Sequence, residues 1–98
     1  IAATNGQEVK IAKFRGAFEW HSHPDADEMF VVLHGSFTME FRDHSVEVRE
    51  GQMIVVPQGV EHRPVTNTDC SVMMIEPAGL VNTGDADASE RTTAGTWI

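Results

Sequence analysis

Apolar and polar residues alternate along short segments of the chain, and turn-forming residues separate these segments at intervals of about 8 to 12 positions. In residues 37–41 the alternation is strict, so Phe37, Met39 and Phe41 share one face and Thr38 and Glu40 the other. Helical periodicity is weak throughout. We expect strands near residues 9–14, 18–23, 28–33, 36–42, 45–49, 52–56, 62–65 and 71–76. This pattern predicts an all-β fold, an antiparallel sandwich or barrel.

The turns between these segments carry glycine. We expect Gly35, Gly51 and Gly59 to adopt positive φ, where glycine has no steric penalty. Residues 29–33 are apolar at every position, which predicts a strand buried on both faces. The second face would pack against another copy of the chain, so a homodimer is expected.

The length of 98 residues suits one domain. The predicted strands span about residues 8–77, which would form the barrel. Residues 78–98 are rich in Ala, Gly, Thr and Asp without periodicity, so we expect an irregular C-terminal tail lying on the barrel.

Charge and composition exclude some classes of protein. The formal net charge is −8 and no cluster of Lys or Arg occurs, which argues against nucleic-acid binding. No apolar run approaches the roughly 20 residues of a membrane-spanning helix. Cys70, the single cysteine, cannot form an internal disulfide and is expected in the core. A cytoplasmic location is therefore expected, although the chain starts at Ile1 without Met and a removed signal peptide stays open.

The segment HSHPDADE, residues 21–28, has the spacing of a metal site. On a strand, His21 and His23 lie about 6.6 Å apart on one face and can bind one ion. Residues 24–27 can reverse the chain, so that Glu28 starts the adjacent strand beside the two imidazoles. His62, which follows the Pro-x-Gly break at Pro57, is the candidate for a fourth ligand.

These residues resemble the two motifs of the cupin superfamily. The first motif, Gly, His-x-His, Glu and Gly, and the second motif, Gly, Pro-x-Gly and His, correspond to Gly16, His21, His23, Glu28, Gly35, Gly51, Pro57, Gly59 and His62. The sequence departs from the motifs in the spacing from Gly16 to His21 and at Thr66, where the family has Asn. Neither departure affects a ligand. The motifs cover residues 16–67.

The resemblance implies a small jelly-roll barrel, or double-stranded β-helix, that holds one divalent metal ion through His21, His23, Glu28 and His62. It also implies a dimer. Histidine-rich ligation favours Fe, Mn, Ni, Cu, Co or Zn over Ca or Mg. Four protein ligands would leave two positions open on a six-coordinate ion for a substrate, water or dioxygen.

Other side chains complete the predicted site. Strand alternation would place Glu19 on the face of His21 and His23, which makes it the candidate general acid or base. By the same argument Phe30 and Val32 follow Glu28 inward and would line an apolar pocket. Trp20 would face away, as a core residue or a dimer contact.

Several residues with metal-binding or polar side chains are expected to have structural roles instead. His34 and His44 lie in turns and should be solvent-exposed. Met39, Met73 and Met74 should fill the core rather than bind metal.

Two functions from different classes fit these features. The first is a metal-dependent enzyme acting on a small oxygen-rich organic molecule, and the resemblance allows a dioxygenase, a sugar-phosphate isomerase or a decarboxylase. Of the cations, only Arg42 and Arg63 lie near the relevant strands, and Arg63 alternates away from His62, which counts against a phosphorylated substrate. The second function is a non-catalytic binding or sensing module, and a purely structural barrel is a third possibility.

Overall fold

The computed structural model describes residues 1–79, which form an all-β structure. Its strands, in chain order, are β1 (Ala2–Thr4), β2 (Gln7–Ala17), β3 (Glu28–His34), β4 (Ser36–Phe41), β5 (Ser45–Arg49), β6 (Met53–Val56) and β7 (His62–Pro77). All pairings between these strands are antiparallel. The all-β class is confirmed, and most of the predicted tail, residues 80–98, lies outside the described residues.

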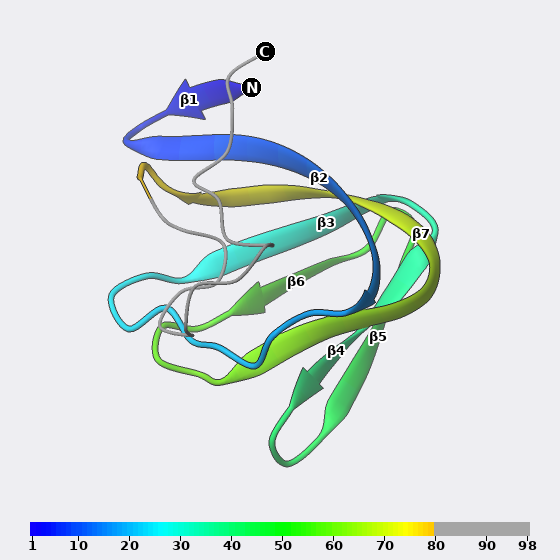
Figure 1. Ribbon diagram of the computed structural model, residues 1–98. Coiled ribbons are helices and arrows are strands. Elements are labelled where there is room, and N and C mark those ends of the chain that lie inside the picture. The colour runs from blue at the N-terminus through cyan, green and yellow to red at the C-terminus, as the bar shows by residue number, and fades with distance from the viewer. Residues whose placement is uncertain (80–98) are drawn as a thin grey trace.

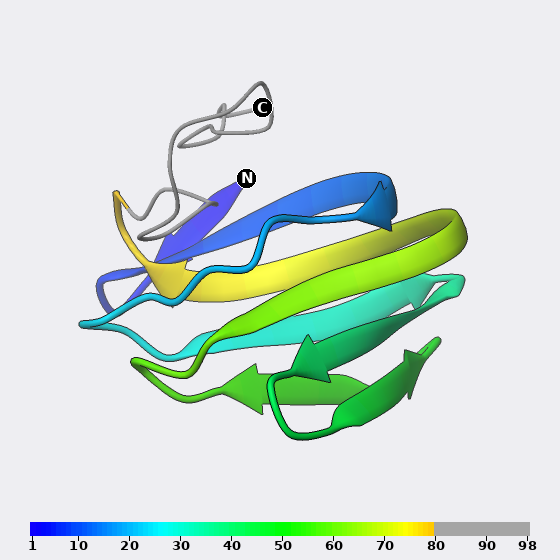
Figure 2. The same cartoon turned by 60° about the horizontal axis from the view of Figure 1, so that its bottom comes forward.

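Strand β7 connects the two sides of the barrel. Its first residues pair with β4, with Phe41 opposite His62, and its later residues pair with β3, with Met29 opposite Ile75. Strand β2 runs along nearly the whole of β7, and the sheet order is β1-β2-β7-β3-β6. Because β7 curves strongly, β4 and β5 are carried to the opposite side of the molecule from β3 and β6 (Figures 1 and 2).

The core lies between these two sides and follows from strand alternation. Phe37 and Met39, on the inward face of β4, are 2% and 0% exposed, as the strict alternation of this segment predicts. The other buried core residues are Phe30, Val32, Val48, Val56, Cys70 and Val72. The predicted core positions of Met39 and Cys70 are confirmed, whereas Met73 and Met74 are only half-buried.

The predicted strand at residues 18–23 is absent. Strand β2 ends at Ala17, and beyond it the backbone N–H of Phe18 still donates to the Pro64 carbonyl at 3.0 Å. Proline has no N–H to donate in return, so the ladder cannot continue at that pair. Only His21 pairs again with β7, as an isolated bridge to His62.

The predicted strands at residues 62–65 and 71–76 are one strand, β7. The pairing with β2 passes through a register shift between Phe14 and Gly16, so the sheet bends there without ending. The hydroxyl of Thr66 donates to the Ser36 carbonyl at 2.9 Å and ties the bend to the start of β4. Strand β1 was not predicted from the sequence.

Strand β3 is buried on one face only within the single chain. Glu28, Phe30 and Val32 are buried, whereas Met29 and Val31 are half-buried and Leu33 is 44% exposed. The expected burial on both faces is therefore not met by one copy of the chain.

Two further predictions concern the turns and the membrane. The predicted positive φ values are confirmed at 82° for Gly35, 81° for Gly51 and 77° for Gly59. In the described part of the chain, no helix has the length and apolar character needed to span a bilayer.

Candidate metal centre

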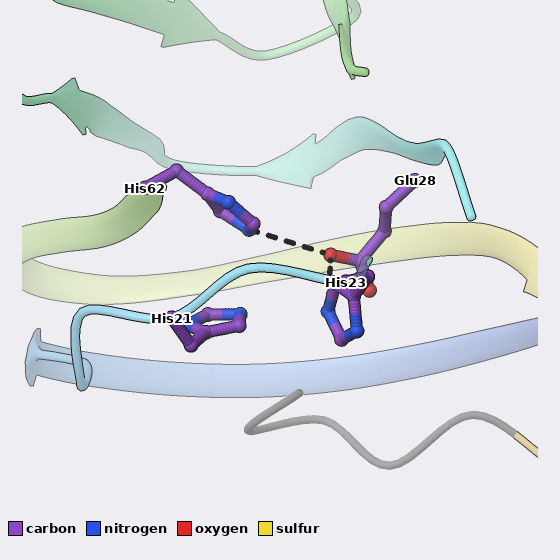
Figure 3. Close-up of side chains that lie close together, drawn as sticks. All are labelled: His21, His23, Glu28 and His62. Carbon is purple, nitrogen blue, oxygen red and sulfur yellow. Dashed lines mark ion pairs between the residues drawn. The ribbon is translucent and has the colours of Figure 1, made fainter. Parts of the chain in front are cut away.

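Three imidazoles and one carboxylate meet inside the barrel. One donor atom from each of His21, His23, Glu28 and His62 lies within 4.8 Å of the others. Figure 3 shows the four side chains turned toward one another, from β3, β7 and the segment before β3. All four are buried, with exposed fractions between 0% and 3%. The structure thus brings together the four residues that the sequence singled out as ligands.

Backbone pairing sets the positions of His21 and His62. The N–H of His21 donates to the His62 carbonyl at 3.1 Å, and the N–H of His62 donates to the His21 carbonyl at 2.9 Å. Directly paired residues in an antiparallel bridge project to the same face. The two ring centroids therefore lie only 4.3 Å apart.

His23 and Glu28 are positioned by a turn and by a second loop. Residues Pro24 and Asp25 form the predicted turn between them. The carbonyl of His23 accepts from the Gly59 N–H at 3.0 Å, and the Asp27 carboxylate accepts from the Gln58 N–H at 2.8 Å. The Pro-x-Gly loop that leads to His62 is therefore attached to the loop that carries His23.

Two histidine rings are oriented by carbonyl groups. Nδ1 of His21 lies 2.7 Å from the Glu19 carbonyl oxygen, and Nδ1 of His62 lies 2.9 Å from the Val60 carbonyl oxygen. A carbonyl can only accept, so each Nδ1 carries a proton, and in the neutral imidazole the lone pair is then on Nε2. This is the tautomer that a metal ion needs from an Nε2 ligand.

Glu28 lies among the histidines as an anion. Its Oε1 is 3.2 Å from His23 Nε2 and 3.6 Å from His62 Nε2. Burial alone would raise the pKa of Glu28, but polar contacts with His23, His62 and Glu76 outweigh it and hold that pKa well below the ordinary value. Burial lowers the pKa of His21, only partly offset by its bond to Glu19, which favours the neutral imidazole.

The donor set fits a divalent transition metal ion. Glu28 Oε1 and His62 Nε2 are buried, and apart from the ion-pair contacts within the cluster they have no hydrogen-bond partner. Leaving such a group unsatisfied costs roughly 1–3 kcal/mol, and more when the group is charged. A cation bound at the common point would offset these costs, and nitrogen donors with one carboxylate suit Fe, Mn, Ni, Cu, Co or Zn.

Two residues beside the ligands were not singled out from the sequence. Glu76 of β7 is 1% exposed and lies next to Glu28, and Lys10 Nζ is 3.1 Å from its carboxylate. Burial, followed by the neighbouring Glu28 carboxyl, raises the pKa of Glu76 to about 7. Strand alternation in the sequence could have identified Glu76. It follows Val72 and Met74 at alternate positions of β7, so its side chain lies on the same face as theirs, toward the core.

A cavity adjoins the donor cluster, and His21 and Glu28 form part of its wall. Phe30 lines this cavity as predicted. Val32 is 1% exposed and belongs to the core, and it is not one of the cavity-lining residues in the described part of the chain.

Glu19 is half-buried and contributes its carbonyl to His21, and its carboxylate is not part of the four-donor group. Glu19 was chosen because a strand was expected at residues 18–23, and that strand is absent. Its role as a general acid or base therefore stays a prediction, without the argument from strand alternation.

The remaining predicted residues lie outside the cluster. His34 and His44 are exposed, with side chains 76% and 58% accessible, as predicted. Trp20 is half-buried and its ring lies under the Arg42 guanidinium, 3.9 Å from the ring centroid. It is therefore a cation–π partner at the surface rather than a core residue.

Comparison with known proteins agrees with this architecture. The chain is 38% identical over 64 residues to the protein YdbB of Bacillus subtilis (strain 168), an alignment that covers 64% of this chain and 57% of YdbB. The chain thus spans less than two thirds of that relative.

Among solved structures, a cupin-2 domain containing protein from Shewanella frigidimarina is 42% identical, with a TM-score of 0.76 and coverage of 78% of this chain and 74% of that chain. Protein NMB1881 from Neisseria meningitidis is 34% identical, with a TM-score of 0.72 and coverage of 78% and 79%. Residues 7–76 also match the sequence model of the cupin domain family. The predicted jelly-roll barrel is confirmed, and the chain belongs to the cupin family.

Proposed function

We propose that this chain is a metal-dependent enzyme that acts on a small organic molecule inside the barrel. The observation that carries the proposal is the convergence of His21, His23, Glu28 and His62 within 4.8 Å at the wall of a cavity. A purely structural site would be closed by its protein ligands. Here the donor cluster adjoins a space that a ligand can occupy.

A bound Fe, Mn, Ni, Cu, Co or Zn ion would supply Lewis acidity or a centre for dioxygen. The chain's own residues prepare that chemistry. The carbonyls of Glu19 and Val60 hold the proton of His21 and His62 on Nδ1, so both Nε2 atoms stay available for the ion. The burial of all four side chains keeps bulk water from competing for the donors.

Within this function, dioxygenase-like chemistry fits better than a sugar-phosphate isomerase. A phosphorylated sugar needs Lys or Arg in its pocket, and no such residue among positions 1–79 lines the cavity. Arg63 donates to Glu40 at 2.7 Å, on the opposite side of β7 from His62. A cytoplasmic location stays part of the proposal.

The alternative is a non-catalytic binding or sensing module in which the metal anchors a ligand. The same cavity and donor set support it. Binding of a ligand without turnover would favour the sensor over the enzyme.

The first test is the metal content of the purified chain and of two histidine variants. His62→Ala removes one of the four donors, so we expect bound metal to fall at least about tenfold. His44→Ala changes an exposed histidine and serves as the matched control, with metal content unchanged. Oxygen consumption with diols, thiols and phenolics then separates the enzyme from the sensor. A wild-type chain that retains none of the six metals would contradict the proposal.

We also propose that two copies pair through the outer face of the main sheet. Cross-strand neighbours place eight apolar side chains there, none of them buried: Val9, Ile11, Met29, Val31, Met53, Val55, Met73 and Ile75. The face is about 15 Å wide across its four strands. A second copy suits it because these eight residues carry no charge, so that pairing through them removes apolar surface from water without burying a charged side chain.

A further inference from the structure

The cavity beside the donor cluster has apolar walls. It is a small cavity of about 70 Å³ that is partly open to solvent. Its main apolar lining residues are Phe14, Phe18, Phe30, Pro64, Val72 and Met74. The polar lining consists of His21 and Glu28, which both belong to the proposed metal site. Away from the donors, a ligand therefore meets only apolar surface in the described part of the chain.

Two aromatic rings flank the donors. Phe18 lies edge-on to His21, with ring centroids 5.5 Å apart, and Phe30 lies edge-on to His62 at 6.4 Å. A ligand that reaches the metal position has these rings beside it. The part of the ligand next to its metal-binding atoms therefore binds best when it is apolar or aromatic.

The charge of the site limits the charge of the ligand. No Lys or Arg of residues 1–79 lines the cavity, and Lys10, which shares the inward face with Met74, is paired with Glu76 at 3.1 Å. With neutral histidines, Glu28 and a divalent ion leave a net charge of +1. One negative charge on the ligand is thus compensated, while a second would be buried without a partner.

We propose that the cavity takes a small molecule with an apolar body and a head of two adjacent oxygen donors that carries one negative charge in total. Two donors match the two positions that four protein ligands leave on a six-coordinate ion. This inference rests on the proposed function, because the metal anchors the head. It excludes sugar phosphates and small dicarboxylates as the preferred ligands.

The test compares two hydroxamates by calorimetric titration of the metal-loaded 98-residue chain. Acetohydroxamate and benzohydroxamate share the same two-oxygen monoanionic head and differ in the body, a methyl or a phenyl group. We expect benzohydroxamate to bind at least about tenfold more tightly, because burying the ring removes more apolar surface from water. 4-Carboxybenzohydroxamate, which adds a second negative charge, should lose at least that gain.

Variants locate the effect in the cavity. Phe18→Ala, or Phe30→Leu if the first variant does not fold, should reduce the preference for benzohydroxamate to less than about threefold while acetohydroxamate binding is retained. Leu33→Ala is the control, because Leu33 is 44% exposed near the end of β3 and does not line the cavity. It should leave the preference unchanged.

The outcomes separate the two proposals. Equal affinity for both hydroxamates, or tighter binding of oxalate or glucose 6-phosphate, would overturn the ligand class while the metal site stands. If the chain holds metal but binds neither hydroxamate, nor oxalate, nor glucose 6-phosphate, the ion has no open position, and the proposed function fails together with this inference.

Discussion

Lys10 and Glu76 form an ion pair inside the barrel, with side chains 15% and 1% exposed. Glu76 also adjoins Glu28, so the pair lies directly behind one of the proposed ligands. Removing one member of a buried pair leaves the other charge unpaired, whereas replacing both with apolar residues is often neutral. The pair is therefore sensitive to single substitutions.

We expect Glu76→Leu to lower the free energy of unfolding by about 3 kcal/mol, because it removes the carboxylate that faces the Lys10 ammonium in this buried ion pair. The double variant Lys10→Met, Glu76→Leu should recover most of that loss. Urea denaturation of the metal-free chain measures both values. If the double variant is as unstable as the single one, the loss comes from packing and not from the broken ion pair.

The turn between β3 and β4 shows how one element depends on a single backbone conformation. Gly35 has φ of +82°, and a Cβ placed on it would lie 2.7 Å from the Asp69 carbonyl oxygen. Gly51 has nearly the same φ, +81°, but open space around it. The two glycines thus separate the cost of the backbone conformation from the cost of the steric clash.

Gly35→Ala should therefore destabilise the chain more than Gly51→Ala. We expect Gly51→Ala to cost about 1–2 kcal/mol for the left-handed conformation alone. Gly35→Ala should cost at least 1 kcal/mol more, because the β3–β4 turn must move away from β7. Thermal unfolding of both variants measures the difference. Equal losses would mean that the turn shifts without cost.

At the scale of the molecule, the eight apolar side chains on the outer face of β2, β7, β3 and β6 predict a dimer. Met53, the most exposed large apolar residue on it at 63%, is the point to test. Met53→Asp should shift the particle in sedimentation from twice the 10.8 kDa chain mass to the monomer. Val46→Asp alters an exposed residue of β5, outside this face, and should leave the dimer intact. A wild-type monomer at micromolar concentration would refute the pairing.

Much of the architecture follows from residue order alone. Alternation in residues 37–41 predicted the inward face of β4, and the turn residues predicted the ends of most strands, because both signals act over a few neighbouring positions. The spacing of His21, His23 and Glu28 with the Pro-x-Gly loop before His62 likewise pointed to one donor cluster. The absence of a strand at residues 18–23 could have been predicted from Pro64. Proline has no N–H to donate, so the pairing of β2 with β7 ends opposite residue 18.

Other features depend on which residues are paired across strands. The union of residues 62–77 into β7, the position of Glu76 behind Glu28 and the apolar walls of the cavity all follow from the registers of β2, β3 and β4 against β7. Register results from the packing of side chains that are distant in the chain, and a shift of one residue reverses the face of each of them. Local patterns therefore identified the donors, whereas folding in three dimensions selected the side chains that surround them.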